Sequence, residues 1–309
     1  MISIRNESSR ESQKFQDEKE KTSKIISKSI LKDTSTSRLS DIIGMDRAKQ
    51  RLREYIVLPI QRPILFQGRR RLLRTIFLYG ASGCGKTVLI KAIAQECNMT
   101  LFHVDITYLF SKWDDRKKII LSKIFKSARR TAPSLILFEK VDFLFPQDDE
   151  PNLNKIRRDI VLELYMQLRS MVDKKEIVYT VVETNKPWNI DRRILRHLGE
   201  RIYVALPTIE DRVGLLEFYS QNFLLASSVE FSELGRHTEG YSAREIELLC
   251  KEVLMVSRRR FQMDRNLGDS STSLEIDMKD FLLALERIER STSPEVLARY
   301  ELWRERIEG

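Results

Sequence analysis

The stretch that decides the fold is Gly80-Ala-Ser-Gly-Cys-Gly-Lys-Thr87. It matches the pattern G-x-x-x-x-G-K-[ST], in which glycines let the backbone wrap a phosphate and exposed N–H groups supply positive potential. We expect Lys86 to reach the β- and γ-phosphates of a nucleotide and Thr87 to ligate Mg²⁺. The residues expected around the phosphates are Gly80, Ala81, Ser82, Gly83, Cys84, Gly85, Lys86 and Thr87.

Short apolar runs alternate with helical patterns on both sides of this loop. The runs typical of strands are Ile76–Tyr79, Leu101–Val104, Leu135–Phe138, Ile177–Val181 and Arg201–Ala205. The patterns typical of helices between them are Val88–Cys97, Lys117–Arg130 and Ile160–Val172. Continuous apolar runs indicate strands that are buried on both faces. The alternation therefore predicts an α/β domain with a parallel sheet flanked by helices.

Strand patterns largely stop after Pro207. The later segments have helical patterns: Asp211–Leu225, Ala243–Arg259, Met278–Arg287 and Pro294–Ile307. We therefore expect an α/β nucleotide-binding domain at 38–207 and a helical lid with a C-terminal helix at 208–309. Residues 1–37 are polar and weakly patterned, so we expect a disordered linker with at most a frayed helix around Ile25–Leu31.

The composition excludes several classes of protein. Of 309 residues, 42% are hydrophobic and 32% charged, and no apolar run approaches the ~20 residues of a membrane span. The N-terminus has no apolar segment typical of a secretory signal. The three cysteines and three histidines suggest neither disulfides nor a metal site. Cys84 lies in the phosphate loop, where a helix N-terminus is expected to lower its pKa and make it reactive.

The net charge of +9 fits either a solvated basic surface or attraction to a polyanion. Such a polyanion could be nucleic acid, an acidic protein tail or a lipid surface. Charge alone does not choose among these, and no recognition motif supports binding to nucleic acid.

Three further blocks accompany the phosphate loop: DIIGMDRAKQRLREYIVLPI at 41–60, TNKPWNIDRRILRHLGERIYVALP at 184–207 and TEGYSAREIELLCKEV at 238–253. Together they resemble the AAA family of ATPases, in particular its microtubule-severing and Vps4-related branch. The ending SPEVLARYELWRERIEG is similar to the C-terminal helix of katanin catalytic subunits, most of all the katanin-like-2 type. The resemblance extends from about residue 40 to the end.

This resemblance implies a set of nucleotide contacts, with ATP and Mg²⁺ as cofactors. Ile42 and Gly44 would lie beside the adenine. Tyr241, Ser242 and Ala243 would lie where the helical lid meets the nucleotide.

The resemblance also implies catalytic roles. Asn185 matches sensor 1, which helps position the attacking water, although a turn residue before Lys186-Pro187 is the plainer explanation. Arg196 matches the first arginine finger, which reaches the γ-phosphate in a neighbouring subunit. The second arginine of the family is His197 here, a weaker donor that is mostly neutral at neutral pH.

The segment SLILFEKVDFLF at 134–145 departs from the family pattern. Glu139 stands where the family has Asp and is expected to help hold Mg²⁺, and Lys140 stands where it has the catalytic Glu. With an ordinary pKa of about 10.4, a lysine is protonated and cannot accept a proton from water. Alternatively, Lys140 points to solvent and another acid such as Asp142 acts as the base.

Two segments resemble the pore loops with which AAA hexamers grip a polypeptide. Lys112 and Trp113 lie among charged neighbours, which favours an exposed loop over a core tryptophan. The glycine of this loop is Asp115 here, which puts its flexibility in doubt. Arg157 and Arg158 match the second loop and could meet an acidic tail, although an arginine pair is more often solvated surface.

The sequence therefore supports two main functional hypotheses. The first is a katanin-like, microtubule-associated ATPase in the cytoplasm that forms a ring and pulls on the acidic tails of tubulin, with hydrolysis impaired by Lys140. The second is a pseudoenzyme that binds ATP and regulates an active katanin-like ring. A Vps4-like disassembly factor ranks lower, because Met263–Ser273 looks too short for the β-rich lid insertion of that type.

Overall fold

The computed structural model describes residues 30–31, 38–66, 74–111, 117–145, 151–171, 176–266 and 275–308. The chain divides into two compact units. The first comprises Met1–Arg38, Arg51–Leu78 and Ile90–Ile202, and the second comprises Leu39–Gln50, Tyr79–Leu89 and Tyr203–Gly309.

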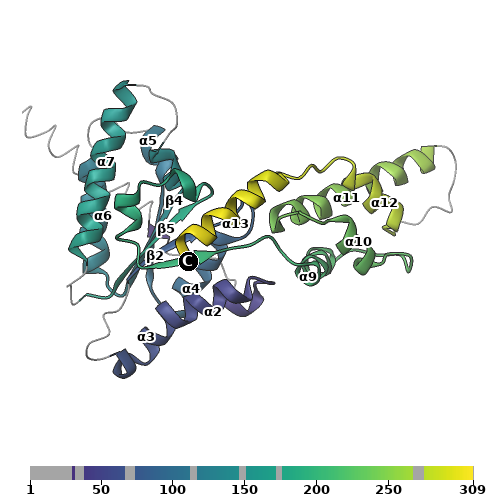
Figure 1. The fold of residues 1–309 in the computed structure, drawn as a ribbon. Helices are drawn as coiled ribbons and strands as arrows, with labels where there is room; N and C mark the ends of the chain where they lie inside the picture. The colour runs from purple at the N-terminus through teal and green to yellow at the C-terminus, as the bar shows by residue number, and fades with distance from the viewer. Residues whose placement is uncertain are drawn as a thin grey trace, which may run out of the picture. The chain divides into compact units, whose positions relative to one another are not determined.

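A six-stranded sheet with the order β1-β3-β4-β5-β2-β6 organises the α/β part of the chain (Figure 1). Its strands are β1 (Ile30–Leu31), β2 (Thr75–Tyr79), β3 (Thr100–Asp105), β4 (Ser134–Glu139), β5 (Val178–Thr184) and β6 (Glu200–Tyr203). Strand β4 pairs in parallel with β3 and with β5. The predicted α/β class with a parallel sheet is confirmed.

Strand β1 corrects one expectation about the N-terminal segment. Ile30 and Leu31 were expected in a frayed helix, but they pair antiparallel with Phe102 and Leu101 of β3. Two residues are too few for a periodic pattern. What makes them a strand is the free edge of β3, which offers backbone hydrogen bonds.

Helices cover the sheet of the first unit. Helix α6 (Lys117–Arg130) and helix α7 (Pro151–Ser170) pack against each other (Figure 1). The ring of Phe125 on α6 stacks on that of Phe138 on β4, with centroids 5.7 Å apart. The shorter elements are α5 (Ile106–Ser111), η4 (Val141–Leu144), η5 (Pro187–Asn189) and α8 (Arg192–Leu195).

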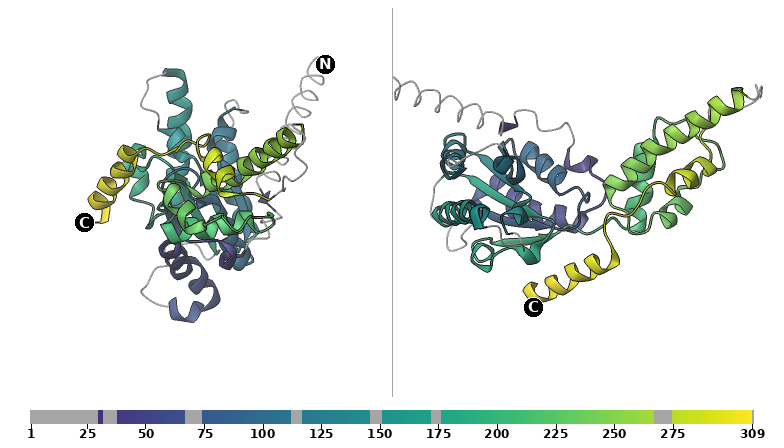
Figure 2. Two further views of the ribbon diagram at one scale, coloured as in Figure 1. Left: turned by 90° about the vertical axis from the view of Figure 1, so that its right-hand side faces the viewer. Right: turned by 90° about the horizontal axis from the view of Figure 1, so that it is seen from above.

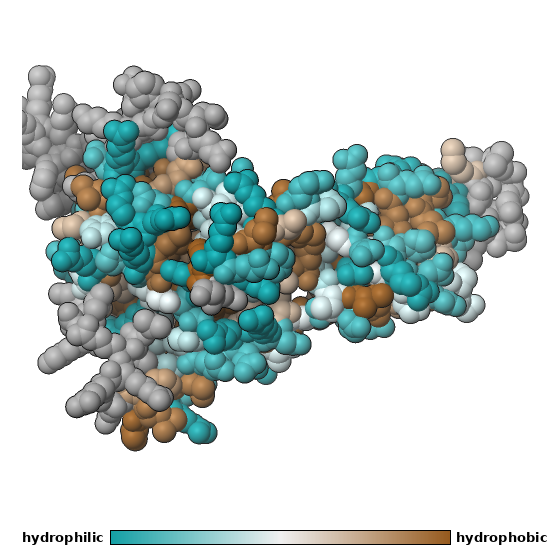
Figure 3. Space-filling view, viewed as in Figure 1, coloured by the Kyte–Doolittle hydropathy of each residue, from teal (hydrophilic) through white to brown (hydrophobic). Residues whose placement is uncertain are grey.

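The N-terminal helices precede β2. They are η1 (Leu39–Asp41), α2 (Asp46–Leu52), η2 (Arg53–Val57), α3 (Leu58–Gln61) and η3 (Pro63–Phe66). At η3, Ile64 is 78% and Leu65 64% exposed. Figure 3, viewed as Figure 1, shows an apolar patch in the region of α3. Among the described residues, no helix is both long and apolar enough to span a membrane.

Four helices of the second unit pack around a shared apolar core (Figure 2). They are α9 (Ile209–Ser220), α10 (Phe231–His237), α11 (Ala243–Asn266) and α12 (Met278–Leu285). Leu216, Leu234 and Phe281 are fully buried between them. Capping boxes at Thr208 and Asp277 begin α9 and α12, because each side chain accepts a backbone N–H of the first turn.

The C-terminal helix α13 (Pro294–Glu308) carries two aromatic side chains into a cluster of the same unit. Trp303 meets Tyr79 edge to face, with ring centroids 4.6 Å apart. Tyr203 lies 5.3 Å from Tyr79 and 5.7 Å from Tyr300. Since Tyr79 ends β2, this cluster holds the residue that comes directly before the phosphate loop.

Candidate functional site

The phosphate loop lies between β2 and helix α4 (Lys86–Glu96), in the predicted strand–loop–helix context. Gly80, Gly83 and Gly85 have φ angles of +153°, +77° and +88°, which side chains rarely adopt. A Cβ atom at Gly80 would lie 2.1 Å from the carbonyl oxygen of Val204. The glycines are therefore required by both backbone conformation and close packing.

The side chain of Lys86 folds into this loop. It is only 4% exposed, and its Nζ donates hydrogen bonds to the carbonyl oxygens of Gly80 at 3.0 Å and Ala81 at 2.8 Å. A buried ammonium beside a helix N-terminus concentrates positive charge. The loop therefore has the shape and the charge of a cradle for a polyanion such as a triphosphate.

Other predicted contact residues lie around the same loop, within the second unit. A Cβ atom at Gly85 would lie 3.1 Å from Met45 Cε, and Met45 follows Gly44. The N–H of Arg244 donates to the carbonyl oxygen of Gly83 at 3.1 Å. The structure thus brings the Ile42–Met45 segment and the start of α11, with Ser242 and Ala243, to the phosphate loop.

The expectation of a reactive Cys84 is wrong. Its side chain is 3% exposed, and burial raises the pKa of the thiol to about 11 despite the favourable charge of Lys86. Desolvation of the thiolate therefore outweighs the helix N-terminus. Within the loop, the buried side chain of Cys84 therefore packs like that of a small apolar residue.

Four polar side chains at the ends of β3 and β4 form one hydrogen-bonded pair and one ion pair. His103 Nε2 lies 2.7 Å from Glu139 Oε2, and Lys140 Nζ lies 2.7 Å from Asp105 Oδ2. Lys140 itself has φ 59°, a left-handed conformation that turns the chain from β4 into η4. Lys140 is thus ion-paired, which differs from the idle surface cation of the alternative hypothesis.

These contacts shift the pKa values of Lys140, Glu139 and Asp105. The hydrogen bond with Asp105 raises the pKa of Lys140, and its partial burial opposes this only in part. The hydrogen bond from His103 lowers the pKa of Glu139. For Asp105, burial raises the pKa, but the hydrogen bonds from Lys140 and Thr107 lower it overall. Lys140 is therefore a cation at neutral pH, and Glu139 and Asp105 are anions.

Asp142 is engaged in a structural role. Its Oδ1 accepts hydrogen bonds from Thr184 Oγ1 at 2.6 Å and from the N–H of Asn185 at 3.3 Å. This oxygen therefore fixes the chain where β5 ends, which argues against Asp142 as a free base. Asn185 lies directly after β5, where its predicted role requires it.

No group of three or more His, Cys, Asp or Glu side chains is arranged to hold a metal ion within the described ranges. Magnesium in nucleotide sites takes most of its ligands from phosphates and water, with one or two protein oxygens. The ionised Glu139 carboxylate and the Thr87 hydroxyl have the right donor chemistry for such a site.

Arg196 and His197 differ in their surroundings. Arg196 directly follows α8 and is exposed, and its side chain makes no hydrogen bond or ion pair with the part of the chain that the structure describes. The ring of His197 meets that of Tyr165 edge to face at 4.7 Å. The predicted second finger position is thus engaged in packing on α7.

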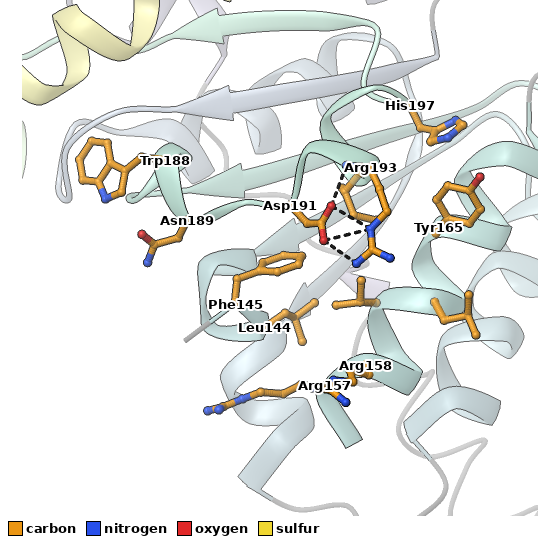
Figure 4. Close-up of a pocket in the computed structure, with 13 residues that line it drawn as sticks. Leu144, Phe145, Arg157, Arg158, Tyr165, Trp188, Asn189, Asp191, Arg193 and His197 are labelled. Carbon is orange, nitrogen blue, oxygen red and sulfur yellow. Dashed lines mark hydrogen bonds and ion pairs between the residues drawn. The ribbon is translucent and has the colours of Figure 1, made fainter. Parts of the chain in front are cut away.

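His197 lines a pocket of about 1150 Å³ in the first unit (Figure 4). Arg157 and Arg158 line it as well, while the guanidinium of Arg193 is paired with Asp191 at 2.7 Å. Arg157 also lies over the ring of Phe143, 5.1 Å from its centroid. The predicted pore residues Lys112 and Trp113 lie outside the described residues.

Sequence comparison identifies relatives across most of the chain. Residues 76–206 match the model of the ATPase family associated with various cellular activities (AAA). Spastin from Danio rerio is 34% identical over 299 residues, which cover 95% of this chain and 52% of spastin. The A-like 1 form of the katanin p60 ATPase-containing subunit from Danio rerio is 33% identical, over 85% of this chain and 56% of its own length. The chain spans about half the length of these relatives.

Comparison with solved structures identifies chains of the same fold. The AAA domain of FIGL-1 superposes with a TM-score of 0.82 at 26% identity, over 93% of this chain and 95% of that domain. A katanin structure from work on its self-assembly gives a TM-score of 0.76 at 27% identity, over 91% and 96% of the two chains. These matches show that the chain contains an AAA ATPase domain at residues 76–206 and that spastin and katanin subunits are among its homologues.

Proposed function

We propose that this chain binds ATP with Mg²⁺ at the phosphate loop. The observation that carries the proposal is the buried Lys86 ammonium inside a loop of three glycines at positive φ. Backbone N–H groups of the loop would hold the phosphates, and Lys86 would neutralise them. Thr87 and Glu139 would supply the protein oxygens to the metal. The FIGL-1 AAA domain, which shares this fold, has been solved with ADP.

The adenine and lid contacts follow from the same arrangement. Ile42 and Gly44 would lie beside the base, since their segment contacts Gly85 through Met45. Ser242 and Ala243 would close the site from the start of α11, which is bonded to Gly83.

We further infer a ring-forming, katanin-like role at cytoplasmic microtubules. Spastin and katanin p60 subunits belong to the relatives of this chain, and katanin is described as self-assembling. Arg196 is exposed, as a residue must be that reaches a nucleotide in a neighbouring protomer. Arg158 is exposed and would offer positive charge to an acidic tubulin tail, together with Lys112 and Trp113, whereas Arg157, expected beside it, is only 9% exposed and packs over Phe143.

A second candidate is a nucleotide-binding pseudoenzyme that regulates an active ring. The ion pair between Lys140 and Asp105 favours it, because a paired and protonated lysine cannot take a proton from water. Asn185 and Arg196 could still position water and stabilise charge, so slow hydrolysis is expected under either candidate.

The test combines binding with assembly. Calorimetric titration should show ATP binding by the wild type and none by Lys86→Ala. Light scattering should then show a larger mass with ATP than with ADP or without nucleotide. Equal ATP affinity of the two proteins would contradict the binding site, whereas a mass independent of ATP in a protein that binds it would contradict only the ring.

Microtubule severing by the wild type, lost in Lys86→Ala, would separate the two candidates. A chain that binds ATP and joins an active katanin-like ring without severing by itself would support the pseudoenzyme.

A further inference from the structure

The pocket of about 1150 Å³ between α7, the end of η4 and the segment from η5 to α8 lies within the first unit (Figure 4). Pockets that bind small organic molecules measure about 300–1,000 Å³ and are mostly apolar, with a few polar groups that fix the ligand. No lining residue comes from the phosphate loop or from the helices of the second unit. The pocket is therefore separate from the proposed nucleotide site.

Aromatic and aliphatic side chains make up much of the lining. Phe145, Tyr165 and Trp188 come from three separate segments of the chain and all line the cavity (Figure 4). Leu162 of α7 also lines it and is 53% exposed, so an occupant would cover apolar surface that water now reaches. Aromatic rings pair favourably with one another in stacked or edge-to-face contacts. The lining therefore favours a ligand with an apolar, aromatic body.

Positive charge exceeds negative charge on the same lining. The described residues that line the pocket include three arginines, at positions 157, 158 and 193, and one carboxylate, that of Asp191. Arg193 neutralises Asp191, with its Nη2 at 2.7 Å and its Nε at 3.1 Å from Oδ2. Arg158 is exposed, and its side chain makes no hydrogen bond or ion pair with the residues that the structure describes. The excess charge favours an anionic group on the ligand.

A buried acceptor gives a third indication of the ligand's chemistry. The Oδ1 atom of Asn189 is buried and accepts no hydrogen bond among the described residues, and Asn189 lines the pocket. A buried acceptor that lacks a donor lowers stability. A small rotation of this amide toward the cavity would let an N–H or O–H group of a ligand supply the missing donor.

We propose that this pocket binds a small aromatic anion, a ring system that carries an acidic group and a hydrogen-bond donor. The rings would pack on Phe145 and Trp188, and the acidic group would pair with the guanidinium of Arg158. A small ligand fits better than a polypeptide with many carboxylates, because the excess charge is small and most of the remaining lining is apolar or aromatic.

A ligand at this place would also contact the short helix α8. Arg193 and Ile194 of α8 line the pocket, and Arg196 directly follows this helix. The proposed site therefore adjoins the segment that presents the predicted arginine finger.

Anilinonaphthalene sulfonate is a suitable probe, because it combines aromatic rings, a sulfonate and an N–H group, and its fluorescence rises in apolar surroundings. Phenylnaphthylamine, which has the same rings and N–H group without the sulfonate, is the matched control ligand. Arg130 provides the control residue, since it is an exposed arginine of the same unit that does not line the pocket. Fluorescence titrations of the full chain compare wild type, Arg158→Ala, Leu162→Trp, Arg130→Ala and Lys86→Ala.

Arg158→Ala is expected to weaken binding of the sulfonate about tenfold and that of phenylnaphthylamine less than about twofold, because only the charged contact is lost. Leu162→Trp should weaken binding of both ligands at least about fivefold, since the larger side chain fills part of the cavity. Arg130→Ala should stay within about twofold of the wild type for both.

Equal affinities of wild type and Arg158→Ala for the sulfonate would overturn the proposal, as would equal losses in Arg158→Ala and Arg130→Ala. Displacement of the probe by a short glutamate peptide at the same concentration would also overturn it, because the pocket would then suit an acidic polypeptide. Lys86→Ala should lose ATP and keep the probe, and loss of both would place the probe in the phosphate loop. A wild type that binds ATP but not the probe would refute this pocket alone and leave the proposed function intact.

Discussion

Lys140 Nζ lies 2.7 Å from Asp105 Oδ2, so the cation at the end of β4 is held by a carboxylate at the end of β3. The two strands are in register here, with Asp105 opposite Glu139. The negative charges of Glu139 and Glu183 also raise the pKa of Lys140. The lysine that we expect at the position of the family's catalytic glutamate therefore lies among acidic side chains.

The first prediction concerns restoring a glutamate at this position. Lys140→Glu alone would place a carboxylate among Asp105, Glu139 and Glu183, so we expect it to destabilise the protein by about 1–3 kcal/mol. Adding Asp105→Asn removes one of the like charges. The double variant should recover thermal stability and hydrolyse ATP at least about tenfold faster than wild type, since a positioned base contributes 10²–10⁴-fold.

Phosphate release and thermal melting measure these two effects. Lys86→Ala in the background of the double variant should abolish the gain, which excludes a contaminating ATPase. Wild-type turnover of about 1 s⁻¹ or faster, unchanged by the substitutions, would show that the base lies elsewhere.

The second prediction concerns acid stability. The pKa values of Asp105 and Glu139 are lowered in the folded protein from their ordinary 3.8 and 4.5. Their contribution to the free energy of unfolding is therefore present above these values and is lost as the pH falls through the folded values. The Lys140 pair is partly exposed, so we expect Asp105→Asn to cost less than about 1 kcal/mol at neutral pH.

Urea unfolding of the wild type and Asp105→Asn at a series of pH values tests this. The stability difference should shrink as the pH falls below about 4, because the wild-type carboxylate becomes protonated. Lys251→Ala, which breaks an exposed pair on α11, serves as a control. A difference that is constant down to the acid transition would contradict the role of the ion pair.

The sequence predicts the parts of this structure that depend on local pattern. The spacing of the glycines predicts the phosphate loop, and the short length of the apolar run Leu135–Phe138 between helical patterns predicts β4. The partner of Lys140 could not be predicted in this way, since Asp105 is 35 residues away and meets it only through the register of β3 and β4.

Arg244 and Cys84 illustrate the same limit. The position of Arg244 beside Gly83 depends on how α11 packs on the loop, which no local pattern reveals. The helix N-terminus beside Cys84 is visible in the sequence, but the burial that dominates its pKa is a property of the folded core.

The third prediction follows from the burial of the thiols. Cys84, Cys97 and Cys250 are all buried, and burial raises the pKa of each to about 11. At pH 8 only about one thiol in a thousand would be ionised, so iodoacetamide should label the native protein very slowly. Mass spectrometry should show fast labelling only after denaturation. Fast labelling of Cys84 in the native state would contradict this prediction and support the earlier hypothesis of a reactive thiol.

The last prediction concerns the helix that ends the chain. Trp303 of α13 contacts Tyr79, and Tyr79 immediately precedes Gly80 of the phosphate loop. Removing the indole leaves a gap beside Tyr79, so we expect Trp303→Ala to cost about 3 kcal/mol in the packing of α13. Because Tyr79 would lose part of its support, ATP affinity should fall as well.

Leu302 is the matched control, since it neighbours Trp303 on α13 but is 57% exposed. Leu302→Ala should change stability by less than about 0.5 kcal/mol and leave ATP binding unchanged. Hydrogen exchange of the α13 amides and calorimetric ATP titration measure the two effects on the same proteins. Faster exchange in Trp303→Ala with wild-type ATP affinity would show that the aromatic cluster anchors α13 without supporting the loop. If Trp303→Ala and Leu302→Ala exchange alike, the indole does not hold the helix at all.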